Sequence, residues 1–461
     1  MSKNDIPSSI HSLFPEILLQ IFEMIIRSAG TNKRPIPFIL GQVCSTWRDI
    51  ILSAPSLWTH IRIPADFDQP PTEATCDSDA AILRDHESLY DLTACLRTMV
   101  ERAGTLPLII HYECHREYPS NTPTFQVLLD HIHRWDEFHL KSLDAVALFT
   151  LKEQHAPFLR ILDIPCTGDV TFSFPFVSCP SLTHLSWPTS ETLPGINGAI
   201  PWGNLESLKV RGSSATDALR VLEYSTKLRH FEHHLDYDDR EVVSGNHIIH
   251  TKLQRVSIKG PLLPFLSLPL LSHLHLFAGT RELPNFFLRS GCVVRLLRIG
   301  DPEGIPGRLL STILHSPSCS SITVLCIRML SYLWFSAELL AALTYTPNSS
   351  EVLLPHLKRL HLSRSCNPRG LFGQMIKSRF VHGNSCLDDF EYDDRRMGSG
   401  MKPRHHDRSI WKDDVDIMLA IPNAHIQYTS SWITIRRDRA ANGSIREGEG
   451  HQSPFQFDTW R

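Results

Sequence analysis

A six-residue phrase of the form Leu-x-x-Leu-x-Leu constrains the fold of this 461-residue chain more than any other feature of its sequence. When other apolar residues are allowed in place of leucine, four of the first six steps between successive phrases are 23 residues. A period of about 20–50 residues is typical of solenoids, in which similar supersecondary units stack on one another. The phrases start at Leu159, Leu182, Leu205, Leu228, Leu253, Leu271, Val294, Ile322, Leu357 and Leu387, and a related phrase starts at Trp135.

Each phrase is expected to form a short strand whose fourth and sixth residues point to the same side. Because one strand cannot bury that side alone, the stacked phrases predict a parallel sheet with a continuous core behind it. Apolar runs at 215–225 and 335–345 predict helices on the convex side. The period fits leucine-rich repeats, but the asparagine ladder of regular repeats is absent. We therefore expect an α/β chain with an irregular repeat solenoid; an unrelated α/β domain with chance leucine spacing is the alternative.

The segment 13–63 precedes the repeats and predicts two amphipathic helices joined by a proline-rich turn. The first helix is expected to start at Pro15, whose missing N–H costs nothing at the first helical position. The second is expected to run up to Pro55, which ends it. The apolar stripes are Ile17, Ile21 and Ile25, widened by Leu18 and Phe22, on the first helix, and Ile39, Val43, Trp47 and Ile51 on the second.

The phrases "PEIL..IF", "VCSTWRDII" and "LW" in this segment resemble an F-box. Phe14 departs from the family, which more often has a second proline there. The resemblance implies docking to the Skp-type adaptor of Skp–cullin–F-box ubiquitin ligases. The adaptor-binding residues that it implies are Pro15, Glu16, Ile17, Leu18, Ile21, Phe22, Val43, Cys44, Trp47, Leu57 and Trp58. The alternative is an ordinary helical hairpin packed on the core of the chain itself.

Two further segments extend the resemblance to the large fungal F-box family with irregular leucine-rich repeats. They read "CLRTMVERAGTLPL", with a helix expected to end near Gly104 and a strand from Leu106, and "LLDHIHRWDEFHL". In the second, we expect a helix through Val127, Leu128, Ile132 and Trp135 and a strand from Phe138 to Leu143. The expected organisation is a flexible N-terminus at 1–12, the F-box at 13–63, a linker at 64–82, the repeat array with a C-terminal cap at 83–437, and a flexible tail at 438–461.

The concave side of the sheet is the expected recognition surface for a protein substrate. There the third, fifth and seventh residues of each phrase face outward, and many of them are cationic. The candidate substrate-binding residues are Lys209, Arg255, Lys259, Arg298, Arg328, Arg359 and His361, with Asp389, Glu391 and Asp393 at the acidic end. Arginine pairs well with carboxylates and phosphates, so an acidic or phosphorylated partner is expected; an ordinary solvated face is the alternative.

We find no phosphate-binding loop, metalloprotease, hydrolase or kinase motif in the sequence. The chain has 25 histidines, so a metal site has to be considered. The expected register places Arg255 between His230 and His273, and a cation there would repel a metal ion. His405, His406 and Asp407 form a further possible ligand set. We expect no enzyme activity, no cofactor and no metal; a degenerate hydrolase or metal enzyme hidden in the repeats is the contrary hypothesis.

The composition of the chain restricts which binding partners and which cellular compartment are expected. A formal net charge of −3 argues against a dedicated nucleic-acid binder. The apolar run from Pro261 to Phe277 is interrupted by prolines, so no membrane contact is expected. The polar N-terminus has no apolar h-region, so no signal peptide is expected. The 11 cysteines are odd in number and form no CxxC pair, which favours the cytoplasm or nucleus. The expected function is a substrate receptor that binds the adaptor and through it a cullin; a non-ligase scaffold is the alternative.

Overall fold

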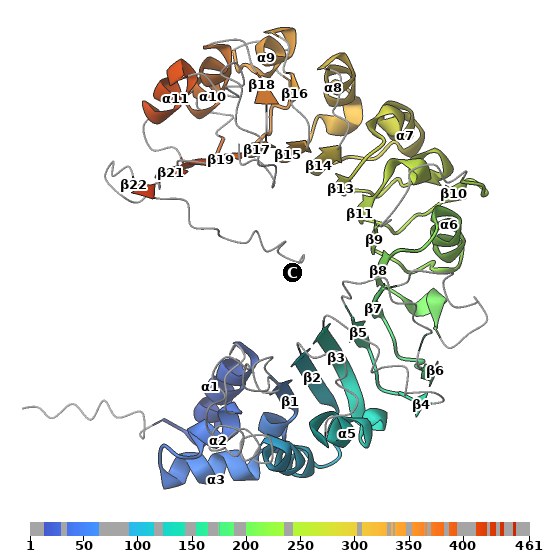
Figure 1. The fold of residues 1–461 in the computed structure, drawn as a ribbon, viewed down its shortest axis with the longest axis vertical. Helices are drawn as coiled ribbons and strands as arrows, with labels where there is room; N and C mark the ends of the chain where they lie inside the picture. Colours follow the sequence, from blue (N-terminus) through green and yellow to red (C-terminus); the bar gives the residue numbers. More distant parts are fainter. Residues whose placement is uncertain are drawn as a thin grey trace, which may run out of the picture. The chain divides into compact units, whose positions relative to one another are not determined.

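The computed structural model has a mixed α/β fold, and most of the helices and strands expected from the sequence are present in it (Figure 1). The described residues are 13–28, 35–63, 92–114, 123–142, 154–164, 174, 176–188, 200–234, 243–301, 307–329, 333–334, 337–346, 353–363, 365–366, 370–381, 387–393, 412–421, 425–429, 434–437 and 446–448. The expected N-terminal segment 1–12, the linker 64–82 and His405, His406 and Asp407 lie outside them.

The chain divides into two units, the first comprising 1–228 with 235–237 and the second the remainder. In the first unit, parallel strands follow the order β1-β2-β3-β5-β7-β8. They are β1 His60–Ile63, β2 Leu108–Cys114, β3 Trp135–Ser142, β5 Ile161–Asp163, β7 His184–Pro188 and β8 Ser207–Arg211. The helices are α1 Pro15–Ser28, α2 Ile36–Leu40, α3 Ser45–Ser53, helical residues 92–102, α5 Pro123–Leu129 and α6 Ala215–Tyr224, and β4 Gln154–His155 pairs with β6 Phe176–Ser178.

In the second unit, parallel strands follow the order β9-β11-β13-β14-β15-β17-β19-β20, and antiparallel β21 and β22 close the sheet. They are β9 His230–His234, β11 Arg255–Ile258, β13 His273–Leu276, β14 Leu296–Asp301, β15 Val324–Met329, β17 Arg359–Ser363, β19 Asp389–Asp393, β20 His425–Thr429, β21 Thr434–Arg437 and β22 Arg446–Gly448. The helices are α7 Leu283–Ser290, α8 Gly307–Leu314, α9 Ala337–Leu343, α10 Leu371–Val381 and α11 Lys412–Leu419. Two small pairs complete the unit, β10 Ile248–Ile249 with β12 Leu266–Ser267 and β16 Leu333–Trp334 with β18 Ser365–Cys366.

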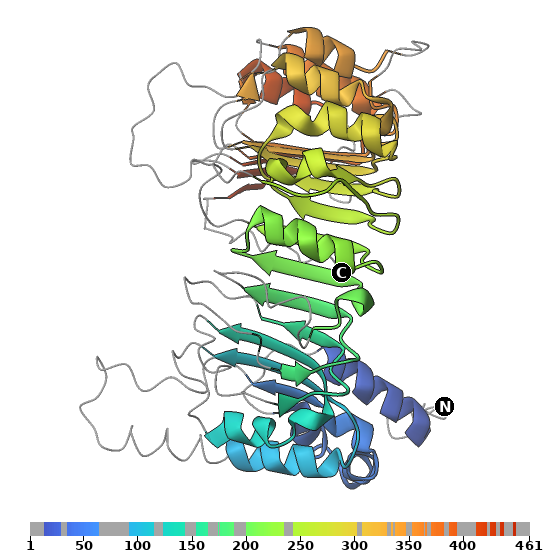
Figure 2. The same ribbon diagram turned by 90° about the vertical axis from the view of Figure 1, so that its right-hand side faces the viewer.

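The register of the strands follows the leucine phrases. From Leu159 to Leu387, every phrase enters its strand at its third residue, and its first, fourth and sixth residues are at most 3 % exposed. The fourth residues pair directly across neighbouring strands, as Leu274, Leu297 and Leu325 do. Within each unit the strands lie side by side and the helices lie along one side of the sheet (Figures 1 and 2). The predicted α/β fold with a long parallel sheet is therefore confirmed.

The second helix of the N-terminal module is broken where the sequence predicts one continuous element. Gly41 follows α2, and Cys44 adopts an extended conformation before α3 starts. The Cys44 Sγ atom accepts a hydrogen bond from the Trp47 backbone N–H at 3.5 Å, which caps the new helix. The expected stop at Pro55 is confirmed, because α3 ends at Ser53, and Pro55 then begins a short 3-10 helix that ends at Trp58.

The buried stripe of α1 lies one residue away from the predicted one. Leu18, Phe22 and Ile26 are buried, whereas Ile17 is 43 % and Ile25 is 37 % exposed. Both sets repeat every four residues, so helical periodicity alone does not distinguish them. The helix therefore has two neighbouring apolar stripes, and only one of them packs on the module.

The segment around Trp135 also differs from its prediction. Helix α5 ends at Leu129, Ile132 lies in a short 3-10 helix, and Trp135 is the first residue of β3 and not the last of a helix. The indole N–H of Trp135 donates to the Leu128 carbonyl at 3.1 Å, which ties the strand to the preceding helix. Gly104 has a φ of +61°, as expected of a residue that follows a helix end.

The N-terminal module is continuous with the sheet, because β1 pairs in parallel with β2. Trp58 lies just before β1, and Trp135 is the first residue of β3. The indole N–H of Trp58 donates to the Ile51 carbonyl at 2.8 Å, again seven residues back. The guanidinium of Arg102 lies 4.6 Å from the centre of the Trp58 ring. The last helix of the module and β1 therefore form the first helix–strand unit of the repeat array, inside the segment assigned to the F-box.

Buried arginines join successive segments on the helical side of the sheet. Arg134 donates to the carbonyls of Val100 and Leu106, which belong to the preceding repeat. Arg379 on α10 is fully buried and donates to the carbonyls of Leu343, Leu354 and Leu353. Leu354 has a φ of +53°, so this arginine also holds an unfavourable backbone conformation. Burial lowers the pKa of Arg379 to about 10, which still leaves it charged at neutral pH.

Replacing Arg379 with leucine is expected to destabilise the second unit by about 3 kcal/mol or more, because three buried carbonyls lose their donor. Lys377→Leu is the matched control, since Lys377 is an exposed residue of the same helix. Urea unfolding with hydrogen exchange of α9 and α10 amides measures both variants. Equal stability of the two variants would contradict the role given to Arg379.

Candidate functional site

The predicted adaptor-binding residues divide into a core and a surface. Ile21 and Cys44 are half-buried. The core residues are Leu18, Phe22, Trp47, Leu57 and Trp58, and the surface residues are Pro15, Glu16, Ile17 and Val43. The core set holds the helices together, since the rings of Phe22 and Trp47 meet edge to face at 4.8 Å between centroids. Only the surface set is free to contact a partner without unfolding of the module.

One side of α1 exposes a row of apolar residues next to its buried stripe. Phe14 is 72 % and Met24 is 64 % exposed. Together with Ile17, Ile21 and Ile25 they lie within about 100° of the helix circumference, at 100° per residue. We call these five residues the apolar flank. Ile39 and Val43, at and after α2, are also exposed. Contiguous apolar surface of this kind on a small module is characteristic of a binding site.

The face of the sheet opposite the helices, which we call the open face, has a cluster of charged groups in the first unit. The rings of His111 and His139 stack with centroids 4.5 Å apart. The His139 ring lies 3.4 Å from the Asp163 carboxylate and 3.6 Å from that of Glu137. Arg160 forms a bidentate pair with Asp136 beside them.

The two stacked histidines have opposite protonation behaviour. Burial lowers the pKa of His139, but hydrogen bonds to Asp163 and Glu137 outweigh it and raise the pKa to about 9. Burial, and then the neighbouring charge of His139, lower the pKa of His111 to about 4. At neutral pH a protonated His139 therefore lies between two carboxylates and against a neutral ring. This arrangement is an ion-pair network, to which Ser186 adds a side-chain hydrogen bond with Asp163.

The predicted cationic stripe is also on the open face, but in two parts. Lys209 lies on β8 in the first unit, and the other candidates lie in the second. Arg359 and His361 share β17, where His361 Nδ1 lies 2.8 Å from the Glu391 carboxylate on β19. The remaining candidates are Arg255, Lys259, Arg298 and Arg328, from β11 to β15. The cationic stripe therefore ends beside carboxylates, which His361 contacts on the neighbouring strand β19.

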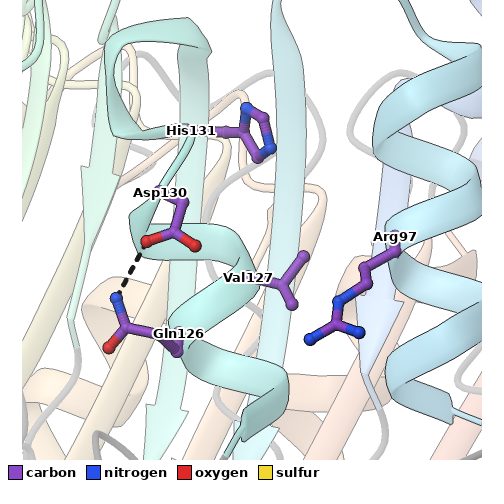
Figure 3. A pocket seen from close by; sticks show the side chains of 5 residues that line it. All are labelled: Arg97, Gln126, Val127, Asp130 and His131. Carbon is purple, nitrogen blue, oxygen red and sulfur yellow. Dashed lines mark hydrogen bonds between the residues drawn. The ribbon is translucent and has the colours of Figure 1, made fainter.

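A pocket of about 350 Å³ lies on the helical side of the first unit, between helical residues 92–102 and α5 (Figure 3). Arg97 extends toward Val127 across the pocket, and His131 also lines it. The Gln126 amide donates to the Asp130 carboxylate at 2.9 Å on its rim. Burial and nearby Arg134 lower the pKa of His131. This set offers polar contacts for a small bound group.

The expected histidine register is confirmed on the open face. His184 pairs with Ser207, and Arg255 lies between His230 and His273. Within the described parts of the chain, no group of three or more His, Cys, Asp or Glu residues is arranged to hold a metal ion. Likewise, no described helix combines the length and apolar character needed to cross a bilayer.

Sequence reasoning missed several residues that the structure brings to these surfaces. Phe14 and Met24 join the apolar flank, His139 and Asp163 form the ion-pair network, and Cys326 lies on the open face between cationic neighbours. His139 and Cys326 are the fifth residues of the phrases that start at Trp135 and Ile322, so the predicted register contained the signal for both. No family model matches the chain, and no curated protein matches it.

The His139 network predicts a loss of stability in alkaline solution. The pKa of His139 is raised from 6.5 to about 9, so its contribution is complete below pH 6.5 and is lost as the pH rises through 9. Relative to His139→Gln, the native chain should lose about 1–3 kcal/mol of unfolding free energy across this window. His133→Gln, at an exposed position, is the control. A difference between native and His139→Gln chains that is constant from pH 6 to 10 would contradict the assignment.

Proposed function

We propose that this chain is the substrate-recognition subunit of a Skp–cullin–F-box type ubiquitin ligase. In this proposal the N-terminal helical module binds a Skp-type adaptor, and the open face of the repeat array binds a protein substrate. The observation that carries the proposal is the apolar flank. It exposes Ile17 and Met24 on the helix that bears the F-box-like phrase, and Phe14 directly before that helix. A surface of this kind needs a partner to cover it.

The adaptor contact would be made by the exposed subset of the predicted residues. Pro15, Glu16, Ile17 and Val43 are accessible, and Met24 extends the surface along α1. Leu18, Phe22, Trp47, Leu57 and Trp58 would act indirectly, because they are core residues that keep the helices in place. Burying the flank against the adaptor would follow the usual pattern of an apolar anchor surrounded by a polar rim.

The receptor would act by proximity and contribute no catalytic group. Because β1 pairs with β2 and Trp58 packs under Arg102, the module is fixed to the sheet of the first unit. A protein bound on that sheet would be held at a set position relative to the adaptor. Such a tether raises the effective concentration of substrate lysines near the ubiquitin-transfer machinery.

The pairing of β1 also favours a second candidate function. A helical module that supplies the first strand of the sheet serves as an N-terminal cap of a repeat array. The chain would then be a non-ligase scaffold for protein–protein interaction. If it binds the adaptor, the two functions differ in whether turnover of a captured partner depends on cullin activity; inhibition of the cullin should stabilise the partner only in the ligase case.

Co-purification of the full chain with a Skp-type adaptor tests the proposal. Ile17→Asp should weaken the complex by about tenfold or more, because a charge is placed in a desolvated apolar contact. Gln20→Asp is the matched control on the polar side of α1, where Gln20 is exposed. Deletion of 1–63 is less informative, since it also removes β1 and the core residue Trp58.

Two outcomes would contradict the docking proposal. One is a well-folded full chain that forms no complex with the adaptor. The other is an Ile17→Asp chain that binds as tightly as the native one. Either result would favour the second candidate function, in which the module serves as the N-terminal cap of the repeat array.

A further inference from the structure

The pocket between helical residues 92–102 and α5 is lined by side chains whose hydrogen-bonding groups are not used within the described parts of the chain. Arg97 is exposed, and among the described residues none accepts a hydrogen bond from its guanidinium or forms an ion pair with it. The ring nitrogens of His131 likewise have no hydrogen-bond partner there; the His133 ring lies beside them, 6.1 Å away between centroids. Both side chains are therefore available to a bound molecule.

The opposite wall of the pocket carries a carboxylate that is held in place. Gln126 and Asp130 are four residues apart, so they lie on the same side of the α5 segment. The Gln126 amide donates to Oδ1 of Asp130 at 2.9 Å. This hydrogen bond orients the carboxylate and leaves its second oxygen, Oδ2, to accept from another donor.

An apolar side chain separates the two charged groups. Figure 3 shows Val127 between Arg97 on one side and the Gln126–Asp130 pair on the other. Val127 is buried, with 7 % of its surface exposed. Because Arg97 forms no ion pair with Asp130, the space above Val127 lies between a cation and an anion that do not neutralise each other directly.

The remaining basic groups near the pocket add no further charge to it. Burial, and then the neighbouring charge of Arg134, lower the pKa of His131, so its ring is neutral at pH 7 and offers one donor and one acceptor. Arg134 itself is occupied, since its guanidinium donates to the carbonyls of Val100 and Leu106. Among the residues that line the pocket, the two full charges offered to a ligand are thus one positive and one negative.

This pair of charges restricts the chemistry of the ligand. A simple anion would meet the carboxylate of Asp130, and a simple cation would meet the guanidinium of Arg97. A molecule that carries both a carboxylate and an ammonium group satisfies both, because the guanidinium fork matches a carboxylate and the Asp130 oxygen accepts from an ammonium group. The volume of about 350 Å³ is within the range of sites for small molecules.

We propose that this pocket binds a free α-amino acid, with its carboxylate on Arg97, its ammonium group on Asp130 and its side chain over Val127. The bound molecule would link helical residues 92–102 to α5, which belong to successive repeats. This site lies on the helical side of the first unit, so the inference goes beyond the proposed function and depends neither on adaptor docking nor on capture of a protein by the open face.

The test is a ligand-observed NMR titration of the full chain with each of the standard L-amino acids at pH 7. At least one of them should bind with a Kd below about 1 mM. Two analogues of that amino acid, one lacking the amino group and one lacking the carboxyl group, should each bind about tenfold more weakly or worse, because each loses one charge-assisted contact.

Variants of the two charged residues locate the site. Arg97→Gln and Asp130→Asn, both at exposed positions, should each weaken binding by about tenfold or more. Asp130→Asn keeps an oxygen that accepts from Gln126, so it removes the charge without removing that hydrogen bond. The control is Arg220→Gln, an exposed position on α6 in the same unit, which should bind as the native chain does.

Three results would each overturn the proposal. The first is that none of the standard amino acids binds with a Kd below about 1 mM. The second is that either analogue binds as tightly as the amino acid itself. The third is native affinity in Arg97→Gln or Asp130→Asn. Adaptor binding by the same variants is measured separately, and its loss or retention does not bear on this site.

Discussion

The rest of the structure depends on one constraint, which is burial. The fourth and sixth residues of every leucine phrase are buried, and successive strands keep the same register. A shift by one residue would place those side chains on the open face and expose the apolar layer. Leu274, Leu297 and Leu325 pair directly across neighbouring strands. The residues that follow them along each strand therefore point to the open face and are level with one another across the sheet. The register therefore builds the core and, by the same step, decides which polar side chains share the open face.

The strands were predictable from the sequence, because their side chains alternate between the two faces of the sheet. Features that depend on how the elements pack against one another were not predictable. Strand positions follow from the phrases, because alternation leaves one arrangement that buries the leucines. The buried side of α1 did not follow, since Ile17 and Leu18 begin equally good helical stripes and only packing selects Leu18. The burial of Arg379 did not follow from the sequence either, because it depends on the carbonyls of Leu343 and Leu354, which are distant along the chain.

The candidate surfaces were predicted in part, for the same reason. Open-face positions of Arg298 and Arg328 follow from the register, but the separation of Arg359 and His361 from them depends on Asp389 and Glu391, on the next strand. In the N-terminal module, sequence similarity marks core and surface residues alike. The structure separates them by burial, and the strand pairing of β1 extends the sheet into the segment that the sequence assigned to the helical module alone.

The most direct test of the account is hydroxyl-radical footprinting of the full chain with and without a Skp-type adaptor. Met24 and Phe14 are 64 % and 72 % exposed, so both react readily in the free chain. The account predicts that the adaptor protects both residues while Phe158 and Tyr224, exposed elsewhere in the first unit, stay equally reactive. Unchanged oxidation of Met24 and Phe14 in the presence of excess adaptor would contradict it.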